Sequence, residues 1–401
     1  MHTREAGRPE PAKLDSEFIQ NPEAVYALLR EEGPVRQVTM AGVPGWLVTS
    51  YDDARALLSD PRLGKDYTRI ADILPPSAVG IYATPLAATM LASDPPDHTR
   101  LRKLVTKAFT AQAIAGFRPV IEQTAEELLD AMADGATADL LSAYALPLPI
   151  AVISAMLGVP KAYQGSFRDW TLSFVSIRPP EVLAEAQRHL SAFLSALIED
   201  KRAQPGDDLL SQLARVAEEG SQLSTEELLR MAFLLLTAGF ETTVNLIANG
   251  VLSLLRHPAQ LALLQSDPAL LPDAVEEFLR YEGPVHVATY RFTKEAVYAG
   301  GTRIPAGQIV LISLLAANRD EDRFPDADRL DITRPPGGHI VFGHGIHRCL
   351  GAPLARLEGQ IAIGKLLGRF PAMTLAAEPS ELRWRSSTLM HGLHSLPVRL
   401  S

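Results

Sequence analysis

The only cysteine of this 401-residue chain, Cys349, lies in the glycine-rich segment FGHGIHRCLGAP at 342–353. Glycines at 343, 345 and 351 allow the backbone to bring N–H groups close to the sulfur. An amphipathic helix is expected directly after this segment, and the partial positive charge at a helix N-terminus favours a thiolate. A thiolate surrounded by amides at a helix start is suited to binding a soft metal or a haem iron.

Two other interpretations of Cys349 stay open at this point. A lone cysteine is most often a small buried hydrophobic residue. His344, His347 and Cys349 also lie close enough in sequence to suggest a zinc site in a helical protein. Structural zinc normally has a fourth protein ligand, and the chain has neither paired cysteines nor an HExxH segment. The zinc interpretation is therefore the weaker one.

The second group of chemically capable residues lies within a long apolar helix predicted over 224–256. Ser224 and Glu227 form a capping box at its start, and no proline follows until Pro258. About 33 residues at 1.5 Å each give a rod of roughly 50 Å. A helix that long and apolar must cross the middle of the core.

Polar residues interrupt this apolar helix in the segment AGFETT at 238–243. Small residues at Ala238 and Gly239 keep one face low, so a flat cofactor could approach it closely. The carboxylate of Glu241 beside the hydroxyl of Thr242 could relay protons into a dry pocket. Alternatively, the Thr242 hydroxyl simply bonds to the carbonyl oxygen four residues earlier.

Glu277 and Arg280 are spaced as an i,i+3 pair on another predicted helix. Such pairs are usually solvated surface ion pairs that contribute a few tenths of a kcal/mol. Apolar neighbours at Val275, Phe278 and Leu279 favour burial of this one.

Together, these three segments resemble the cytochrome P450 family of haem-thiolate monooxygenases, in particular its soluble bacterial branch that tailors macrolides and other polyketides. Phe342, Gly345, Cys349 and Gly351 stand at the family's spacing. The resemblance implies one mainly α domain over 1–401, a triangular prism of helices with small β-sheets. Haem b, iron protoporphyrin IX, would lie between the long central helix and the cysteine loop.

The same resemblance implies a role for each matching residue. Cys349 would be the axial ligand of the haem iron, and Glu241 and Thr242 would be the acid–alcohol pair that activates oxygen. The haem propionates would be bound by His98, Arg102, Arg291 and His347. Structural roles would fall to Glu277, Arg280, Arg329 and Phe342, with Arg329 completing the network of the buried pair. The substrate pocket would include the loop at 63–91 together with Phe240, Val285, Val287, Leu389 and Met390.

By the same resemblance, the protein would hydroxylate or epoxidise a medium-to-large apolar natural product such as a macrolide, another polyketide, a terpenoid or a steroid. It would use O2 and electrons from a ferredoxin, itself reduced by an NAD(P)H-dependent ferredoxin reductase. The donor would meet a basic face comprising Arg100, Lys103, Lys107 and Arg348. A peroxygenase or non-oxygenase of the same fold is the alternative, although such proteins typically lack the acid–alcohol pair.

Composition sets limits on the other classes of function. Hydrophobic residues make up 47% of the chain and charged residues 21%, which is typical of a globular protein. A net charge of −9 argues against nucleic acid as a partner. No segment has the pattern of a membrane span, and a single cysteine favours the reducing cytoplasm. Two hairpins are expected, joining 35–39 to 46–49 and 297–299 to 309–312.

Overall fold

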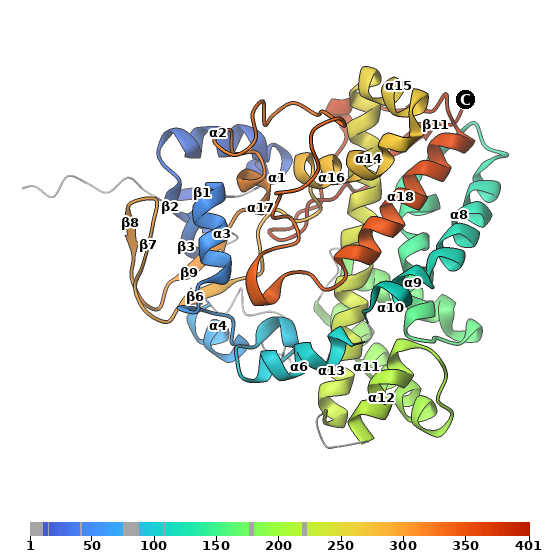
Figure 1. The fold of residues 1–401 in the computed structure, drawn as a ribbon, viewed down its shortest axis with the longest axis horizontal. Helices are drawn as coiled ribbons and strands as arrows, with labels where there is room; N and C mark the ends of the chain where they lie inside the picture. The colour runs from blue at the N-terminus through green and yellow to red at the C-terminus, as the bar shows by residue number, and fades with distance from the viewer. Residues whose placement is uncertain are drawn as a thin grey trace, which may run out of the picture.

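The computed structural model describes residues 11–14, 16–40, 42–74, 88–107, 109–175, 180–218 and 223–401. Helices dominate them (Figure 1). The α-helices are α1 (Ser16–Gln20), α2 (Pro22–Glu31), α3 (Tyr51–Ser59), α4 (Tyr67–Ile73), α6 (Asp97–Thr106), α7 (Ala111–Ala115), α8 (Arg118–Met132), α9 (Pro147–Met156), α10 (Gln164–Val175), α11 (Pro180–Ala203), α12 (Leu209–Glu218), α13 (Thr225–Gly239), α14 (Glu241–Arg256), α15 (Pro258–Ser266), α16 (Leu271–Tyr281), α17 (Leu314–Ala317) and α18 (Ala352–Arg369). Short 3-10 or π turns are η3 (Met90–Ala92), η4 (Leu141–Ala145), η5 (Lys161–Tyr163), η6 (Pro268–Leu270), η7 (Gly345–His347) and η8 (Pro379–Glu381).

The strands form one larger sheet and two small ones. They are β1 (Ala12–Leu14), β2 (Val35–Met40), β3 (Val43–Val48), β4 (Leu63–Gly64), β5 (Thr137–Asp139), β6 (Arg291–Thr293), β7 (Val297–Ala299), β8 (Thr302–Ile304), β9 (Ile309–Ile312), β10 (Thr374–Leu375) and β11 (Pro397–Arg399). The six-stranded sheet has the order β1-β2-β3-β9-β6-β4, the three-stranded sheet β10-β11-β5, and β7 pairs with β8. Figure 1 shows the larger sheet on the side of the molecule opposite α8 and α18.

One of the two predicted hairpins is confirmed and the other is wrong. Strands β2 and β3 pair antiparallel with Val35 opposite Val48. Strand β7 does not pair with 309–312; it turns back on β8 through Gly300 and Gly301, both with positive φ. Two glycines that adopt this conformation close a tight two-residue hairpin. The segment 309–312 is instead β9, which lies between β3 and β6 in the larger sheet.

The long helix predicted over 224–256 is present but is interrupted by one residue. Its capping box forms as expected, with reciprocal bonds between Ser224 and Glu227. Helix α13 ends at Gly239 and α14 begins at Glu241, with Phe240 between them at φ −106° and ψ −46°. The side chain of Phe240 is buried in the largest hydrophobic cluster. No proline lies at this break, so the sequence did not predict it.

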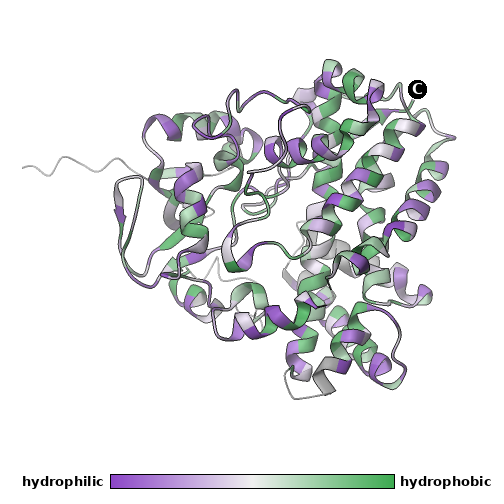
Figure 2. Cartoon of the chain, in the orientation of Figure 1, coloured by the Kyte–Doolittle hydropathy of each residue, from purple (hydrophilic) through white to green (hydrophobic). Residues whose placement is uncertain are grey.

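The combined run Thr225–Arg256 is the one helix of the described ranges that has the length and hydropathy of a membrane span. Within its most apolar window, 67% of the residues are buried inside the protein, as in the core helix of a globular fold. Helix α14 contacts α15, α16, α18 and η4, so it is surrounded by other helices. Hydrophobic residues accordingly predominate along α14, whereas the outer helices alternate hydrophobic and hydrophilic residues (Figure 2).

The segment 63–91, expected to be a substrate loop without regular structure, is partly ordered into short elements. It begins with β4, continues through α4 and reaches the start of η3 at its end. The Asp66 side chain caps α4 by accepting a hydrogen bond from the Thr68 N–H, which accounts for a helix there. Residues 75–87 of the predicted loop lie outside the described part of the chain.

Candidate active site

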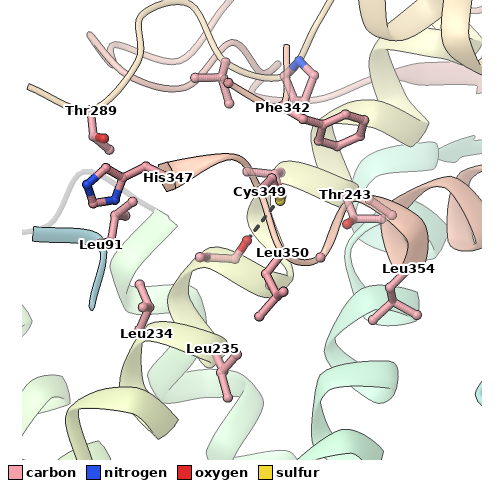
Figure 3. Close-up of a pocket in the computed structure, with 18 of the residues that line it drawn as sticks. Leu91, Leu234, Leu235, Thr243, Thr289, Phe342, His347, Cys349, Leu350 and Leu354 are labelled. Carbon is pink, nitrogen blue, oxygen red and sulfur yellow. Dashed lines mark hydrogen bonds between the residues drawn. The ribbon is translucent and has the colours of Figure 1, made fainter. Parts of the chain in front are cut away.

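A cavity of about 300 Å³ lies between the junction of α13 with α14 and the loop that precedes α18 (Figure 3). It collects residues that are distant in sequence, including His98 of α6, Thr242 of α14, Arg291 of β6 and Cys349. Most of the surface that lines it is apolar, and its ionisable side chains are few. A concave apolar site with a few convergent polar groups is the usual form of a small-molecule site.

The cysteine loop is shaped by hydrogen bonds of its own backbone. The Cys349 N–H donates to the carbonyl oxygen of Phe342 at 2.8 Å, and the Arg348 N–H donates to that of Gly345 at 3.1 Å. Gly345 has a φ of +74°, and a Cβ there would lie 2.9 Å from the carbonyl oxygen of Leu58. Only glycine fits that conformation and that close approach. The loop therefore places Cys349 at the cavity wall.

Opposing effects act on the Cys349 thiol. Burial raises its pKa, because a thiolate loses hydration. The N–H groups of Gly351 and Ala352, at the start of α18, and the cations Arg102 and Arg348 lower it. These same groups would stabilise a thiolate once a metal takes the place of the proton. The predicted arrangement of amides around the sulfur is thus present.

Four predicted cofactor-binding residues converge at one end of the cavity. His98, Arg102, Arg291 and His347 all line it. The rings of His98 and His347 are in contact, with centroids 4.1 Å apart. Both ring nitrogens of His98 are buried and have no hydrogen-bond partner within the described ranges. Buried polar atoms are nearly always satisfied, so this end of the cavity is built for a polar group.

The sequence analysis missed two ionisable residues of this cavity. Lys65 lies at its cationic end, where its amine donates a hydrogen bond to the hydroxyl of Thr289. Glu358 of α18 is 2% exposed, and burial raises the pKa of its carboxyl to about 8, so it is protonated at neutral pH. Lys65 directly follows a two-residue strand, a signal too weak to detect. Glu358 stands on the same helix as the cysteine loop and could have been found by its position in an apolar stretch.

The structure separates the two predicted catalytic residues. Thr242 lines the cavity, and its hydroxyl donates a 3.2 Å hydrogen bond to the carbonyl oxygen of Ala238. Glu241 is not among the lining residues; its carboxylate lies 3.2 Å from the guanidinium of Arg385. Burial raises the pKa of Glu241, and Arg385 lowers it. Adjacent residues on a helix point in directions about 100° apart, which accounts for the separation.

Three of the five residues named for the substrate pocket line the cavity. Val285, Leu389 and Met390 do so, and an antiparallel bridge joins Val285 to Met390. Phe240 and Val287 do not line it, because both side chains are buried in hydrophobic clusters. Val285 is bridged to Met390, whereas Val287 is bridged to Ser313, in a different part of the chain. The structure thus brings Val285, Leu389 and Met390 to the cavity and does not bring Phe240 and Val287 there.

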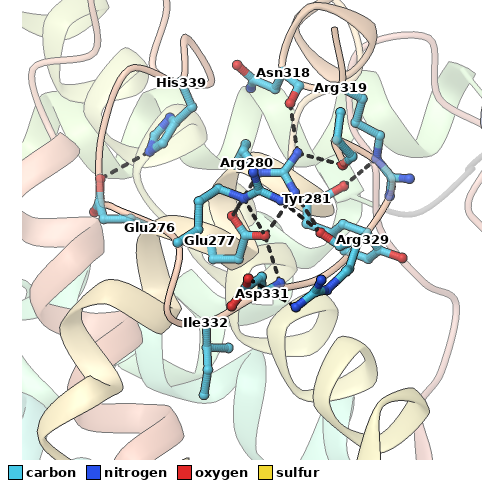
Figure 4. A network of polar contacts seen from close by, with 12 residues as sticks. Glu276, Glu277, Arg280, Tyr281, Asn318, Arg319, Arg329, Asp331, Ile332 and His339 are labelled. Carbon is cyan, nitrogen blue, oxygen red and sulfur yellow. Dashed lines mark hydrogen bonds and ion pairs between the residues drawn. The ribbon is translucent and has the colours of Figure 1, made fainter. Parts of the chain in front are cut away.

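The predicted buried pair is present at the end of α16 (Figure 4). Arg280 donates to both carboxylate oxygens of Glu277, at 2.7 and 2.8 Å. The same guanidinium donates to the carbonyl oxygens of Asn318, Ala327 and Arg329. All these groups are buried or nearly so, and the guanidinium satisfies them together.

Arg329 does not complete this network in the way that was predicted. Its backbone carbonyl accepts from Arg280, but its side chain is 64% exposed and pairs with Asp331. Besides Arg280, the guanidinium of Arg334 contacts the Glu277 carboxylate, at 3.3 Å. The role that the resemblance implied for the Arg329 side chain is therefore filled by Arg334.

The residues predicted for the donor face divide into two groups. Lys103 and Lys107 of α6 and Arg348 of the cysteine loop are exposed. Arg100 instead forms an ion pair with Glu227 at the start of α13. Arg102 connects the two elements, since it donates to the carbonyl oxygen of Arg348 at 2.6 Å. A basic surface on α6 therefore lies next to the cysteine loop.

A zinc site is not formed in the described part of the chain. No group of three or more His, Cys, Asp or Glu side chains there is arranged to hold a metal ion. His347 contacts His98 in place of a shared site with His344 and Cys349. The zinc interpretation is therefore wrong for these residues.

Comparison with known proteins identifies the family. Residues 150–391 match the sequence model of the Cytochrome P450 family, so the chain belongs to the cytochrome P450 family and is a haem-dependent monooxygenase. It is 51% identical to Cytochrome P450 107B1 of Saccharopolyspora erythraea over 98% of both chains. It is 46% identical to the 6-deoxyerythronolide B hydroxylase of that organism, over 94% of this chain and 95% of the relative. The structure of tirandamycin C-bound P450 monooxygenase TamI has a TM-score of 0.91 and 49% identity, covering 98% of this chain and all of that one.

The cavity fits the haem that this family requires. Haem b has an iron at its centre and two carboxylates on one edge. The cavity has a cysteine thiol on its wall and a cluster of cations and histidines at one end. The unpartnered ring nitrogens of buried His98 are the observation that carries the fit, because a carboxylate would accept a hydrogen bond from the ring N–H. When bound, the haem supplies an iron that activates O2 and transfers one oxygen atom to substrate.

Replacing Cys349 with serine tests the thiol. Cys349→Ser removes the soft anionic donor while nearly preserving side-chain volume, and no other cysteine can substitute for it. We expect loss of the red-shifted Soret band that the reduced, CO-bound wild type gives, with an unchanged circular dichroism spectrum. A wild-type CO spectrum in Cys349→Ser would exclude Cys349 as the iron ligand.

Breaking the Glu277–Arg280 pair tests its importance for stability. Glu277→Ala leaves a buried guanidinium without its carboxylate, and we expect the free energy of unfolding in urea to fall by about 3–5 kcal/mol. Arg329→Ala is the matched control, since its exposed side chain makes only a surface ion pair and its loss should cost less than about 1 kcal/mol. Equal losses in the two variants would contradict the assignment.

Proposed function

We propose that this protein hydroxylates or epoxidises a medium-to-large apolar natural product of the macrolide or other polyketide type. The observation that carries this proposal is the apolar half of the cavity, opposite its cationic end. Its walls include Leu234, Leu235, Val285, Leu389 and Met390. Such walls gain stability from covering apolar surface and hold few polar groups that would demand partners.

The relatives support the same substrate class. One is named for 6-deoxyerythronolide B, and another was solved with tirandamycin C bound.

The substrate class can be tested by titrating the purified haem protein with each of these compounds, and with a steroid for comparison. We expect the polyketides to shift the Soret band. Incubation with electron donors and O2 should then yield a product with one added oxygen atom by mass spectrometry. A shift and product with the steroid alone would contradict the proposed substrate class.

In this proposal, Cys349 would ligate the haem iron, and His98, Arg102, Arg291 and His347 would hold the haem propionates. Their convergence in one cavity is the support for these roles. Phe342 lines the cavity beside the cysteine loop and packs against the guanidinium of Arg356, which lies 4.6 Å from its ring centroid. The backbone hydrogen bond from Cys349 to Phe342 would hold the sulfur at the cavity wall.

Proton delivery is assigned to Thr242 and Glu241. Thr242 lies at the cavity surface, where its Oγ1 can accept a hydrogen bond and can donate its proton once the bond to the Ala238 carbonyl oxygen is released. Glu241 lies one residue away beside Arg385, away from the cavity. Its carboxyl can take up protons from the outside of the helix and pass them on to Thr242 through movement of its side chain or through water.

Electrons are proposed to come from a ferredoxin that is reduced by an NAD(P)H-dependent reductase in the cytoplasm. The described basic surface near Cys349, made of Lys103, Lys107 and Arg348, supports an acidic donor. Because the whole chain has a net charge of −9, this local patch would orient such a donor as it approaches.

Thr242→Ala tests the role of the hydroxyl. Alanine keeps the helix, so we expect NAD(P)H to be consumed while product per reducing equivalent falls about tenfold or more, with hydrogen peroxide released. Thr237→Ala is the control, because Thr237 makes the same kind of bond to a carbonyl four residues earlier but does not line the cavity. Wild-type coupling in Thr242→Ala would mean that the hydroxyl only bonds within its helix.

Charge reversal tests the donor surface. The double variant Lys103→Glu and Lys107→Glu should slow reduction by ferredoxin roughly tenfold at low salt and flatten its salt dependence. Lys161→Glu with Arg303→Glu changes the net charge equally on other exposed segments and serves as the control. Stopped-flow reduction rates that fall equally in both double variants would argue for net charge and against a docking surface.

A further inference from the structure

Lys65 occupies a position for which the active site described above has no role. Strand β4 pairs antiparallel with β6, with Leu63 opposite Thr293 and Gly64 opposite Phe292. Continuing this register by one residue places Lys65 opposite Arg291. Two like charges directly opposite each other on neighbouring strands destabilise a sheet. Placing Lys65 opposite Arg291 therefore lowers the stability of the sheet.

Burial of the Lys65 amine destabilises its charged form further. Lys65 is 3% exposed, and burial together with Arg291 lowers the pKa of its amine well below the usual value, although the charge of Asp94 acts in the opposite direction. The amine donates to the Thr289 hydroxyl, and it forms no ion pair with a carboxylate in the described ranges. The nearby carboxylate of Asp94 accepts instead from the backbone N–H of Lys65, at 3.1 Å. A buried ammonium group is stable only when an anion compensates it.

We propose that Lys65 binds a carboxylate of the haem, as a fifth side chain beside the four assigned to the propionates. Lys65, Arg102 and Arg291 all line one cavity and provide cations for the two carboxylates. The haem carboxylate then takes the role of the missing counter-ion, and a charge-assisted hydrogen bond replaces the repulsion between Lys65 and Arg291. This inference rests on the haem that the family requires and is independent of the substrate proposed above.

An acidic substrate could supply the same carboxylate chemistry, but the geometry favours the haem. Thr289, which accepts from Lys65, lies beside His347, two residues before Cys349, whereas Leu234 and Leu235 lie on a different part of the wall (Figure 3). Arg291 is the first residue of β6 and Lys65 directly follows β4, the strand that pairs with β6, so the sheet positions both side chains. A ligand that is always bound is the suitable counter-ion for a permanently buried charge.

The test compares haem retention in variants of the haem-loaded enzyme. Lys65→Met keeps the length of the side chain and removes its charge, and the rate of haem transfer to excess apomyoglobin should rise about tenfold or more. Lys65→Gln, which can still donate to Thr289, should also lose haem faster, whereas Lys65→Arg should retain it. Lys294→Met is the control, because Lys294 is exposed and lies 4.0 Å from Asp94.

Two further measurements separate this role from a structural one. Without haem, Lys65→Met should unfold at the wild-type temperature or higher, since a desolvated amine is gone; with haem, it should unfold at a lower temperature. The midpoint potential of the iron should also fall, because a nearby cation favours the reduced state.

Three results would overturn the proposal. One is haem transfer at the wild-type rate in both Lys65→Met and Lys65→Gln. Another is an equal loss of thermal stability with and without haem, which would make Lys65 a purely structural residue. The third is unchanged haem retention combined with a weaker Soret shift by palmitic acid, which would assign the amine to an acidic substrate.

Discussion

The buried guanidinium of Arg280 is the contact on which the cysteine side of the molecule depends. It is a rigid fork whose donors reach a carboxylate on its own helix and three carbonyl oxygens at 318–329. These carbonyls belong to the chain that leads toward the cysteine loop, and Asn318 in turn accepts from the N–H of Ile340 at 2.7 Å. Helix α16 thereby fixes an irregular segment that has no strand or long helix of its own. The position of the Cys349 sulfur therefore depends on that segment.

The cavity has a cationic end and an apolar remainder, and this difference would orient a ligand that carries carboxylates at one edge. Cations and histidines gather at the end formed by α6, β4 and β6, whereas the walls from α9 and α13 are aliphatic. Haem carboxylates have favourable partners at the first end alone. The remaining volume then has almost no polar group to align a substrate, so orientation there must come from shape.

Much of this site could be predicted from the sequence because its strongest signals are local. Glycines around Cys349 and the i,i+3 spacing of Glu277 and Arg280 report short-range geometry directly. The errors concern side-chain direction: Phe240, Val287 and Arg329 were assigned by position, and packing turns each away from its predicted contact. Lys65 was missed for the opposite reason. Its importance comes from a strand pairing between residues more than 200 positions apart, which no local pattern contains.

The interruption at Phe240 divides the central helix into two mechanical parts. Helix α14 packs against α16 and α18 and so belongs with the cysteine loop, whereas α13 contacts α10, α11 and α12; helix α9 contacts both. The wall residues Leu234 and Leu235 are on α13, and Thr242 is on α14. A displacement of α10, α11 or α12 would therefore act on the apolar walls of α13 before it acts on the segment that faces the cysteine. The break at Phe240 thus separates the helix that shapes the apolar walls, α13, from the helix that carries Thr242, α14.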